Sequence, residues 1–211
     1  ANTALTRLHC GTNQLTSLDL SANTAESFAL DCRDSQLSNI IFPPNLYSLE
    51  AHGNPLGSLD MSSFASLYFF GCNSCELTYL NIKNGNYLDL FQVTSNEDLT
   101  CIETLDPDWA TANYTGIPDG TTFDVICGAE GRTHWYVNTT GSDASGSGTL
   151  ASPLANIQTA INAATDGDTV SVAAGTYVEN LVFGGKNLSL IGADSSNTII
   201  DGDSVSQVIN L

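Results

Sequence analysis

One slot in the first half of the chain recurs at a nearly constant spacing, and this repeat constrains the fold more than any other feature. In five copies the slot holds Cys10, Cys32, Ala51, Cys72 and Val93. The copies follow one another after 22, 19, 21 and 21 residues. A leucine or phenylalanine lies two residues before each copy, and an Asn, Ser or Cys lies three residues after it. Such a period is typical of solenoids, in which each coil buries its apolar face against its neighbours.

A second apolar stripe follows the slot in four of the copies. It comprises the pairs Leu18 and Leu20, Ile40 and Phe42, Leu59 and Met61, and Leu80 and Ile82. The residue three positions after the slot is Asn13, Asn54 and Asn96 in three copies. Because buried backbone groups need hydrogen-bond partners, we expect these side chains to form a ladder that satisfies the turns inside the stack.

The spacing of these residues carries a resemblance to a known family. Leu5, Leu8, Cys10, Asn13 and Leu15 match the template L-x-x-L-x-L-x-x-N/C-x-L of leucine-rich repeats. Together with the phrase at residues 13–24, this part of the chain resembles bacterial secreted leucine-rich repeat proteins with a period near 21. The resemblance implies display at the cell surface, adhesion or protein–protein contact. We place this domain at residues 1–128.

Residues 99–127 look like the C-terminal cap of that family. The last coil of a stack has no neighbour to cover it, and small secreted caps often carry a disulfide where the core is thin. We therefore expect Cys101 to pair with Cys127. The segment 72–75 is a lone CxxC motif, and a redox or zinc site would need a thioredoxin context or a second pair. We interpret its cysteines as structural: Cys10, Cys32 and Cys72 as buried core thiols and Cys75 as the occupant of the turn slot.

The pattern changes at His134. Residues 135–137 read as a short strand, and the Gly-, Ser- and Thr-rich stretch up to residue 152 as a linker. Apolar residues at helical spacing predict a helix over 153–164, with Pro153 in its first turn. Short strands are expected at 169–172, 177–183, 188–191, 198–200 and 205–211.

One helix followed by many short strands suits a capped parallel β-helix. The segments 173–180, 186–192 and 198–202 are similar to the start of right-handed β-helices of the pectin lyase-like superfamily, and to the opening of pectin methylesterases. In these families the catalytic residues lie on later rungs, so the resemblance implies a fold and no activity. We therefore predict a mainly β solenoid: a leucine-rich repeat domain, a linker and first strand at 129–152, and the capped start of a right-handed parallel β-helix at 153–211.

The charge balance excludes several kinds of partner. The chain has 23 Asp and Glu residues against 5 Lys and Arg, a formal net charge of −18. Nucleic acids and anionic membrane surfaces are poor partners because they need clustered cations. No apolar run approaches the length of a transmembrane helix, so we expect no membrane insertion. Charged residues make up 13% of the chain, so Ser, Thr, Asn and Gly supply most surface polarity, which favours an extracellular location.

We find no pattern that predicts catalysis. The three histidines are His9, His52 and His134, and the sequence supplies no partner that would place any of them in a nucleophile–base pair. Lyase chemistry needs cations to stabilise a developing dianion, and the β-helix part has Lys186 alone, in an expected turn. We expect neither an enzyme nor a cofactor.

Two Asp-rich turns lie at residues 166–168 and 201–203. They lack the ordered ligand spacing of a calcium loop, and we interpret them as solvated corners. Calcium binding at these turns is the alternative.

The concave strand face is the usual binding surface of a leucine-rich repeat solenoid. The outward positions there are Arg7, His9, Asp31, Arg33, Glu50, His52, Asn73, Gln92 and Thr94. Two of the five basic residues and two of the three histidines fall in this set, which favours a polar ligand or partner. The alternative is that these side chains are solvated and bind no ligand or partner.

The sequence thus favours a non-enzymatic extracellular adhesive or structural module of a large cell-surface protein. The expected partners are other protein subunits, the rest of a longer polypeptide, or surface glycans. The chain enters a repeat without a cap and ends in an apolar strand at residues 208–211, so we expect it to belong to a larger assembly. The alternatives are the non-catalytic N-terminal region of a carbohydrate-active enzyme and a glycan-binding module.

Overall fold

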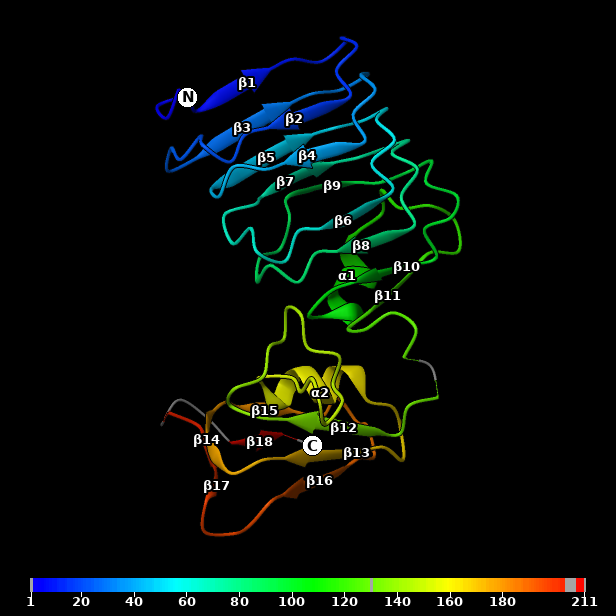
Figure 1. Cartoon of the computed structure of the whole chain (residues 1–211). Coiled ribbons are helices and arrows are strands. Elements are labelled where there is room, and N and C mark those ends of the chain that lie inside the picture. Colours follow the sequence, from blue (N-terminus) through cyan, green and yellow to red (C-terminus); the bar gives the residue numbers. More distant parts are fainter. Residues whose placement is uncertain (1, 130, 204–207, 211) are drawn as a thin grey trace. The chain divides into compact units, whose positions relative to one another are not determined.

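The chain forms a mainly β solenoid, as predicted, with about nine turns and a period near 21 residues. A computed structural model describes residues 2–129, 131–203 and 208–210. The chain divides into two compact units (Figure 1). The first comprises residues 1–104 and 108–123, and the second residues 105–107 and 124–211. Each unit has its own hydrophobic core, so each is described by itself.

Two rows of parallel strands form the first unit. The five-stranded sheet has the order β1 (Arg7–His9), β3 (Phe28–Asp31), β5 (Leu46–Glu50), β7 (Phe69–Gly71) and β9 (Leu90–Gln92). On the other side of the coils, β2 (Ser17–Asp19) pairs with β4 (Asn39–Ile41). A four-stranded sheet continues that side with β6 (Ser58–Asp60), β8 (Tyr79–Asn81), β10 (Cys101–Glu103) and β11 (Thr122–Asp124).

The core of the first unit lies between these two rows of strands. In the five-stranded sheet the register aligns Leu8, Leu30, Leu49, Phe70 and Phe91. Of these, the three in the middle of the sheet are almost completely buried. The predicted repeat register is therefore correct, because a shift by one residue would turn these side chains to solvent.

The predicted asparagine ladder is confirmed. Asn54 Nδ2 donates to the carbonyl oxygens of Cys32 and Ala51, both at 2.9 Å, and Asn54 Oδ1 accepts from the Leu37 amide at 3.0 Å. Asn96 makes the equivalent bonds two coils later, with its Oδ1 accepting from the Cys75 amide at 2.9 Å. Each buried asparagine thus satisfies backbone groups of its own coil and of the preceding coil.

The cysteines divide differently from the prediction. Cys101 and Cys127 form a disulfide, as expected. Cys72 and Cys75 form a second disulfide, so the prediction of a core thiol at Cys72 and of an unpaired Cys75 in the turn slot is wrong. The slot residue and the residue three positions later face each other across the tight turn, with Cα atoms 5.5 Å apart, a separation that suits a disulfide. Cys10 and Cys32 are free, but only Cys32 is fully buried.

A short cap follows the last coils of the first unit. It contains α1 (Pro107–Asn113), in which Ala110 is the buried residue. After α1 the chain returns to the edge of the five-stranded sheet, where Gly116 forms a parallel bridge with Gln92. A Cβ atom on Gly116 would lie 2.6 Å from the Phe91 carbonyl oxygen, so this close approach requires glycine.

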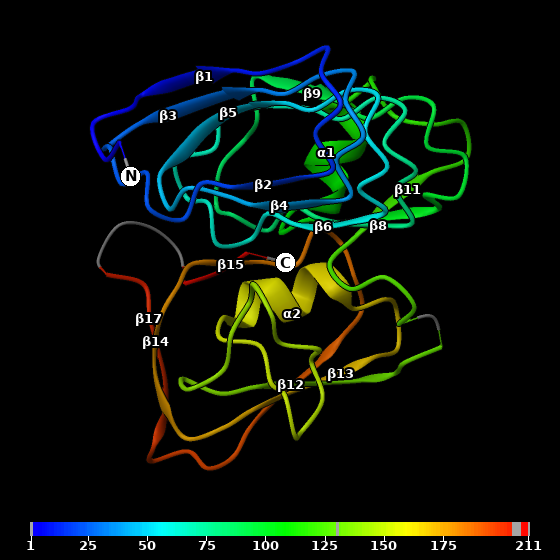
Figure 2. The same cartoon turned by 45° about the horizontal axis from the view of Figure 1, so that its top comes forward.

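The second unit repeats the coil pattern with different side chains. Its main sheet has the order β12 (His134–Val137), β13 (Thr169–Val172) and β16 (Ser189–Gly192). The parallel pair β14 (Gly175–Val178) and β17 (Thr198–Asp201) forms a second side, and β15 (Leu181–Val182) with β18 (Ile209–Asn210) forms a third. The helix α2 (Ile157–Ala163) packs against β12, β13 and β15 and covers the first coil of this unit (Figure 2).

Several predicted boundaries in the second unit are wrong. The helix begins at Ile157 and not at Pro153, because the Leu154 amide donates to the Tyr136 carbonyl and draws this segment alongside β12. The strand expected at 177–183 is divided into β14 and β15 by a corner. Of the strand expected at 205–211, positions 205–207 and 211 lie outside the described residues.

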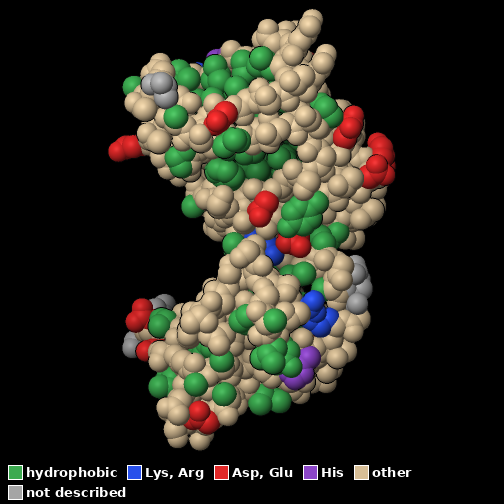
Figure 3. All heavy atoms as spheres, in the orientation of Figure 1, with side chains coloured by type: hydrophobic (Ala, Val, Ile, Leu, Met, Phe, Trp, Pro, Cys, Tyr) green, Lys and Arg blue, Asp and Glu red, His purple; other side chains and the backbone are tan. Residues whose placement is uncertain are grey.

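The surface agrees with the acidic composition. Figure 3 shows acidic side chains spread over the face it draws, with exposed hydrophobic side chains between them and few basic ones. Among the described residues, no helix has the length and apolar character needed to cross a membrane.

Candidate binding face of the first unit

The five-stranded sheet gathers eight of the nine predicted binding residues into two neighbouring rows on its outward face. The parallel register aligns His9, Asp31, Glu50 and Gln92 in the first row, with Gly71 between the last two. The second row, two residues further along each coil, contains Arg33, His52, Asn73 and Thr94. Arg7 lies apart from them, opposite Ala29.

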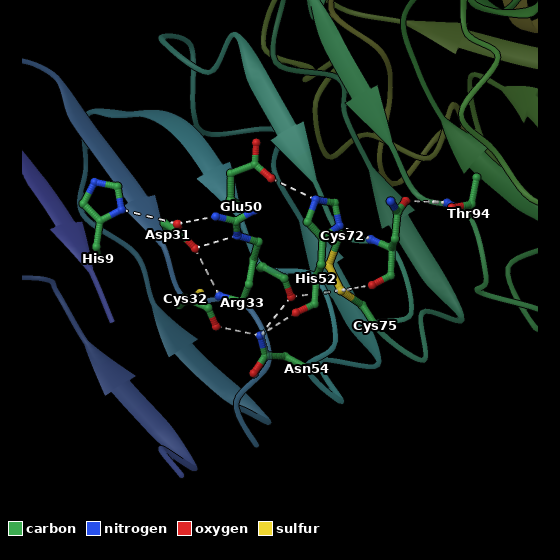
Figure 4. A network of polar contacts seen from close by, with 12 residues as sticks. His9, Asp31, Cys32, Arg33, Glu50, His52, Asn54, Cys72, Cys75 and Thr94 are labelled. Carbon is green, nitrogen blue, oxygen red and sulfur yellow. Dashed lines mark hydrogen bonds and ion pairs between the residues drawn. A yellow bond between two sulfur atoms is a disulfide. The ribbon is translucent and has the colours of Figure 1, made fainter. Parts of the chain in front are cut away.

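Asp31 is the centre of one polar cluster on this face (Figure 4). Arg33 donates to both carboxylate oxygens of Asp31, from Nε at 2.9 Å and from Nη2 at 2.7 Å. His9 Nδ1 lies 3.3 Å from Asp31 Oδ2 on the other side. Mainly because of the hydrogen bonds from the Arg33 side chain, the pKa of Asp31 falls from its ordinary value of 3.8 to about 2. The carboxylate is therefore held ionised and oriented.

His52 organises the second polar cluster. The Asn73 backbone N–H donates to His52 Nδ1 at 2.8 Å, so this nitrogen acts as the acceptor. In the neutral ring the proton then resides on Nε2, which lies 2.8 Å from Glu50 Oε2 and donates to it. A Cβ atom on Gly71 would lie 2.7 Å from His52 Nε2, so glycine at this position makes room for the Glu50–His52 pair.

The same cluster continues one coil further. Asn73 Oδ1 accepts a hydrogen bond from the Thr94 backbone N–H at 2.8 Å. Figure 4 shows the labelled side chains His9, Asp31, His52 and Thr94 following one another across the coils. The outward face is therefore a set of polar groups that hold one another in place, and none of these contacts pairs a nucleophile with a base.

An open pocket lies at the end of the same sheet, and the sequence prediction missed it. It has a volume of about 470 Å³, and all of its lining residues belong to the first unit. Its aromatic lining includes Tyr68, Tyr87 and Trp109, and its polar lining includes Asp89, Gln92 and Asn113. The spacing of 21 residues between Tyr47 and Tyr68, which repeats the coil period, is the signal that would have indicated an aromatic edge.

A buried ion pair is a second feature that the sequence prediction missed. Lys83 Nζ lies 2.9 Å from Glu103 Oε2, and the Lys83 side chain is only 2% exposed. Tyr79 donates to the same carboxylate at 3.4 Å. Burial first, and then the negative charge of Glu103, raise the pKa of Tyr79 to about 12. These groups lie on or next to β8 and β10, where they satisfy one another.

The second unit contains a serine–histidine contact that the sequence did not indicate. His134 Nε2 lies 2.8 Å from Ser171 Oγ, and Ser171 borders a pocket of about 390 Å³. A catalytic triad also needs a carboxylate on the other ring nitrogen. In the described part of the chain no hydrogen bond to His134 Nδ1 occurs, and the ring stacks on Tyr136 at 4.6 Å instead. Among the described residues, the pair therefore has no carboxylate in the position that a triad requires.

In the two acidic turns, Asp166, Asp201 and Asp203 are exposed, as expected for solvated corners, and Asp168 is the exception. Asp168 is not a solvated corner: it is buried, and its Oδ2 accepts from Trp135 Nε1 at 3.1 Å and from the Thr165 amide at 2.8 Å. Lys186 follows a turn, but its Nζ donates to the carbonyl oxygens at the end of α2. Within residues 2–129, 131–203 and 208–210, no three His, Cys, Asp or Glu side chains are grouped so as to hold a metal ion.

Comparisons with known proteins give no relative from which a role for this face could be taken. A scan of protein-family models, a search of curated proteins and a search of solved structures each found no match to the chain.

Proposed function

We propose that this chain is a non-enzymatic binding and structural module of an extracellular or cell-surface protein, and that its ligand contacts the outward face of the sheet β1–β3–β5–β7–β9. The observation that carries the proposal is the pair of polar rows on this face, whose side chains are already ordered by one another. Ordered side chains lose little conformational entropy when a ligand binds, which favours recognition.

Binding is better supported than catalysis on this face. The ionisable groups of the two rows, such as Asp31 with Arg33 and Glu50 with His52, are engaged with one another. The open pocket beside them offers aromatic rings and planar polar groups, which are recognition elements. These features suit a surface that holds a partner.

The assignment of each unit to a fold family rests on the sequence pattern. The five slot residues and the asparagine ladder support a leucine-rich repeat solenoid for the first unit. The cap helix and the short parallel strands support the start of a pectin lyase-like right-handed β-helix for the second. Two disulfides support an oxidising, extracellular compartment. In this proposal the partners are other subunits, surface glycans or the rest of a longer chain.

The test is direct binding of the purified chain to immobilised extracellular polymers. The panel contains neutral and acidic polysaccharides, purified matrix proteins and a second copy of the chain, and interferometry measures the affinity. We expect binding to at least one polymer and a loss of at least tenfold in the Arg33→Ala and His52→Ala variants.

Glu26→Gln is the matched control, because Glu26 is exposed and lies before β3, outside both rows. We expect it to bind like the unchanged chain. Absence of binding to every polymer, or equal binding by all variants, would overturn the proposal.

A further inference from the structure

The pocket at the end of the five-stranded sheet has the chemistry of a sugar site. We propose that it binds a neutral hexose unit of a polysaccharide, and that the stacked Tyr47–Tyr68 pair extends the site along the polysaccharide chain. This inference rests on the proposed binding function and names the class of its ligand.

Exposed aromatic rings form the apolar part of the site. Tyr87 is 57% exposed and Tyr68 is 41% exposed, although both are large apolar rings. A flat ring of this kind offers a surface on which the C–H face of a pyranose packs, with the polarised C–H groups directed at the negative face of the ring. The pocket volume of about 470 Å³ suits a small ligand.

The rings are held in place before any ligand arrives. The Tyr87 and Trp109 rings have centroids 4.0 Å apart, and Trp109 in turn packs edge-on against Tyr114 at 5.2 Å. The Tyr114 hydroxyl accepts a hydrogen bond from the Leu88 amide at 2.8 Å. The aromatic platform is therefore anchored to the lead-in of β9 and loses little freedom on binding.

Planar polar groups with free capacity complete the site. Asp89 and Gln92 are exposed, and neither side chain has a hydrogen-bond partner among the described residues. Asn113 Nδ2 donates to the Trp109 carbonyl at 2.7 Å, which leaves its Oδ1 as an acceptor. Carboxylate and amide groups together present both donors and acceptors, as neighbouring sugar hydroxyls require.

The charge of the site selects among sugars. Asp89 in the pocket and a formal net charge of −18 repel uronate and sulfated units. A cation enclosed by aromatic rings is the other ligand that such a lining suggests. The close contact between Tyr87 and Trp109 leaves no gap for a cation between these two rings, so the arrangement favours a neutral sugar lying on an exposed ring face.

The aromatic surface extends beyond one sugar unit. Tyr47 stacks on Tyr68 with centroids 6.0 Å apart and planes 9° apart, and Tyr47 is itself 38% exposed. The two rings come from successive coils, whose strands lie about 4.8 Å apart in a parallel sheet. The track therefore runs from β5 to the pocket, which suits a polymer better than a single sugar.

The experiment is calorimetry with neutral oligomers of glucose, mannose and galactose, two to six units long. We expect at least one series to bind, with affinity that rises with length. Tyr87→Ala should lower the affinity for oligomers of every length at least tenfold. Tyr47→Ala should weaken the six-unit oligomer and leave the two-unit oligomer unchanged. Ile41→Ala, an exposed apolar side chain on the other row of strands, should bind normally.

Three results would overturn the inference: no neutral oligomer binds at up to about 10 mM, Tyr87→Ala binds like the unchanged chain, or only oligogalacturonate or choline binds. Thermal melts of each variant show that it is folded. If the polar-row variants still abolish binding to a protein partner, the proposed function stands and only the sugar site fails.

Discussion

At the scale of single residues, we expect Asp31 to make the stability of the first unit depend on pH. Its pKa lies near 2 in the folded chain, below the ordinary value of 3.8, chiefly because Arg33 donates to it. A lowered pKa stabilises the fold at pH values above the ordinary pKa, and this stabilisation is lost as the pH falls through the folded value. We therefore expect the stability difference between the unchanged chain and Asp31→Asn to be full at pH 6 and to shrink between about pH 4 and pH 2.

Urea unfolding midpoints at a series of pH values measure this difference. The Arg33→Gln variant removes the main donor, so Asp31→Asn made in that background should show a much smaller pH-dependent gap. A gap that stays constant from pH 6 to pH 2 would show that the Arg33 contact does not act on the Asp31 carboxylate.

Asn54 should be among the side chains whose loss costs most in stability. It is fully buried, and its side chain bonds to three backbone carbonyl oxygens and one backbone amide. Asn54→Ala should lower the free energy of unfolding by roughly 2–4 kcal/mol, because these groups lose their partner. Asn13→Ala, at the same slot of an exposed coil, should cost less than about 1 kcal/mol. Chemical denaturation of both variants provides the comparison, and equal costs would contradict the ladder.

At the scale of elements, α2 depends on side chains from later coils. The Glu179 carboxylate accepts from the amides of Ile157 and Gln158, both at 2.8 Å, at the N-terminus of the helix. Lys186 Nζ donates to the carbonyls of Ile161 and Asn162, at 3.0 and 2.8 Å, near the C-terminus. Both charges complement the helix dipole, and a helix of seven residues is too short to be stable alone.

We expect Glu179→Gln and Lys186→Met each to lower the stability of the second unit by about 1–2 kcal/mol. Asp203→Asn, an exposed change in the same unit, is the control and should have little effect. Hydrogen exchange at the amides of α2 gives an independent measurement. If exchange there does not rise in Glu179→Gln, this carboxylate is not what holds the helix terminus.

At the scale of the whole molecule, the chain has two separate hydrophobic cores and one tryptophan in each unit. Trp109 lies in the first unit, and the buried Trp135 lies in the second. Single-tryptophan variants therefore report the unfolding of each unit. In the Trp135→Phe background, Asn54→Ala should lower the unfolding midpoint that Trp109 fluorescence reports. In the Trp109→Phe background, the same change should leave the unfolding midpoint that Trp135 fluorescence reports unchanged. Equal shifts of both transitions would show that the two units unfold together.

The sequence by itself determined the solenoid, its period, the slot residues that are buried and the asparagine ladder. These features depend on the local spacing of apolar and amide side chains, which each coil repeats. The disulfide between Cys101 and Cys127 also followed from the sequence, through the resemblance of this segment to a known cap. Of the candidate binding face, the outward polar residues were predictable, because alternation along a strand decides which side chains point out.

Only the tertiary structure decided which of these residues meet. The pocket joins Tyr68, Tyr87 and Trp109 from separate segments, and Glu179 reaches back to an earlier helix. The burial of Asp168 depends on Trp135, 33 residues away. Each contact requires atoms from distant segments to come within a few ångströms. The path of the chain around each coil determines that proximity, and residue spacing alone does not encode it.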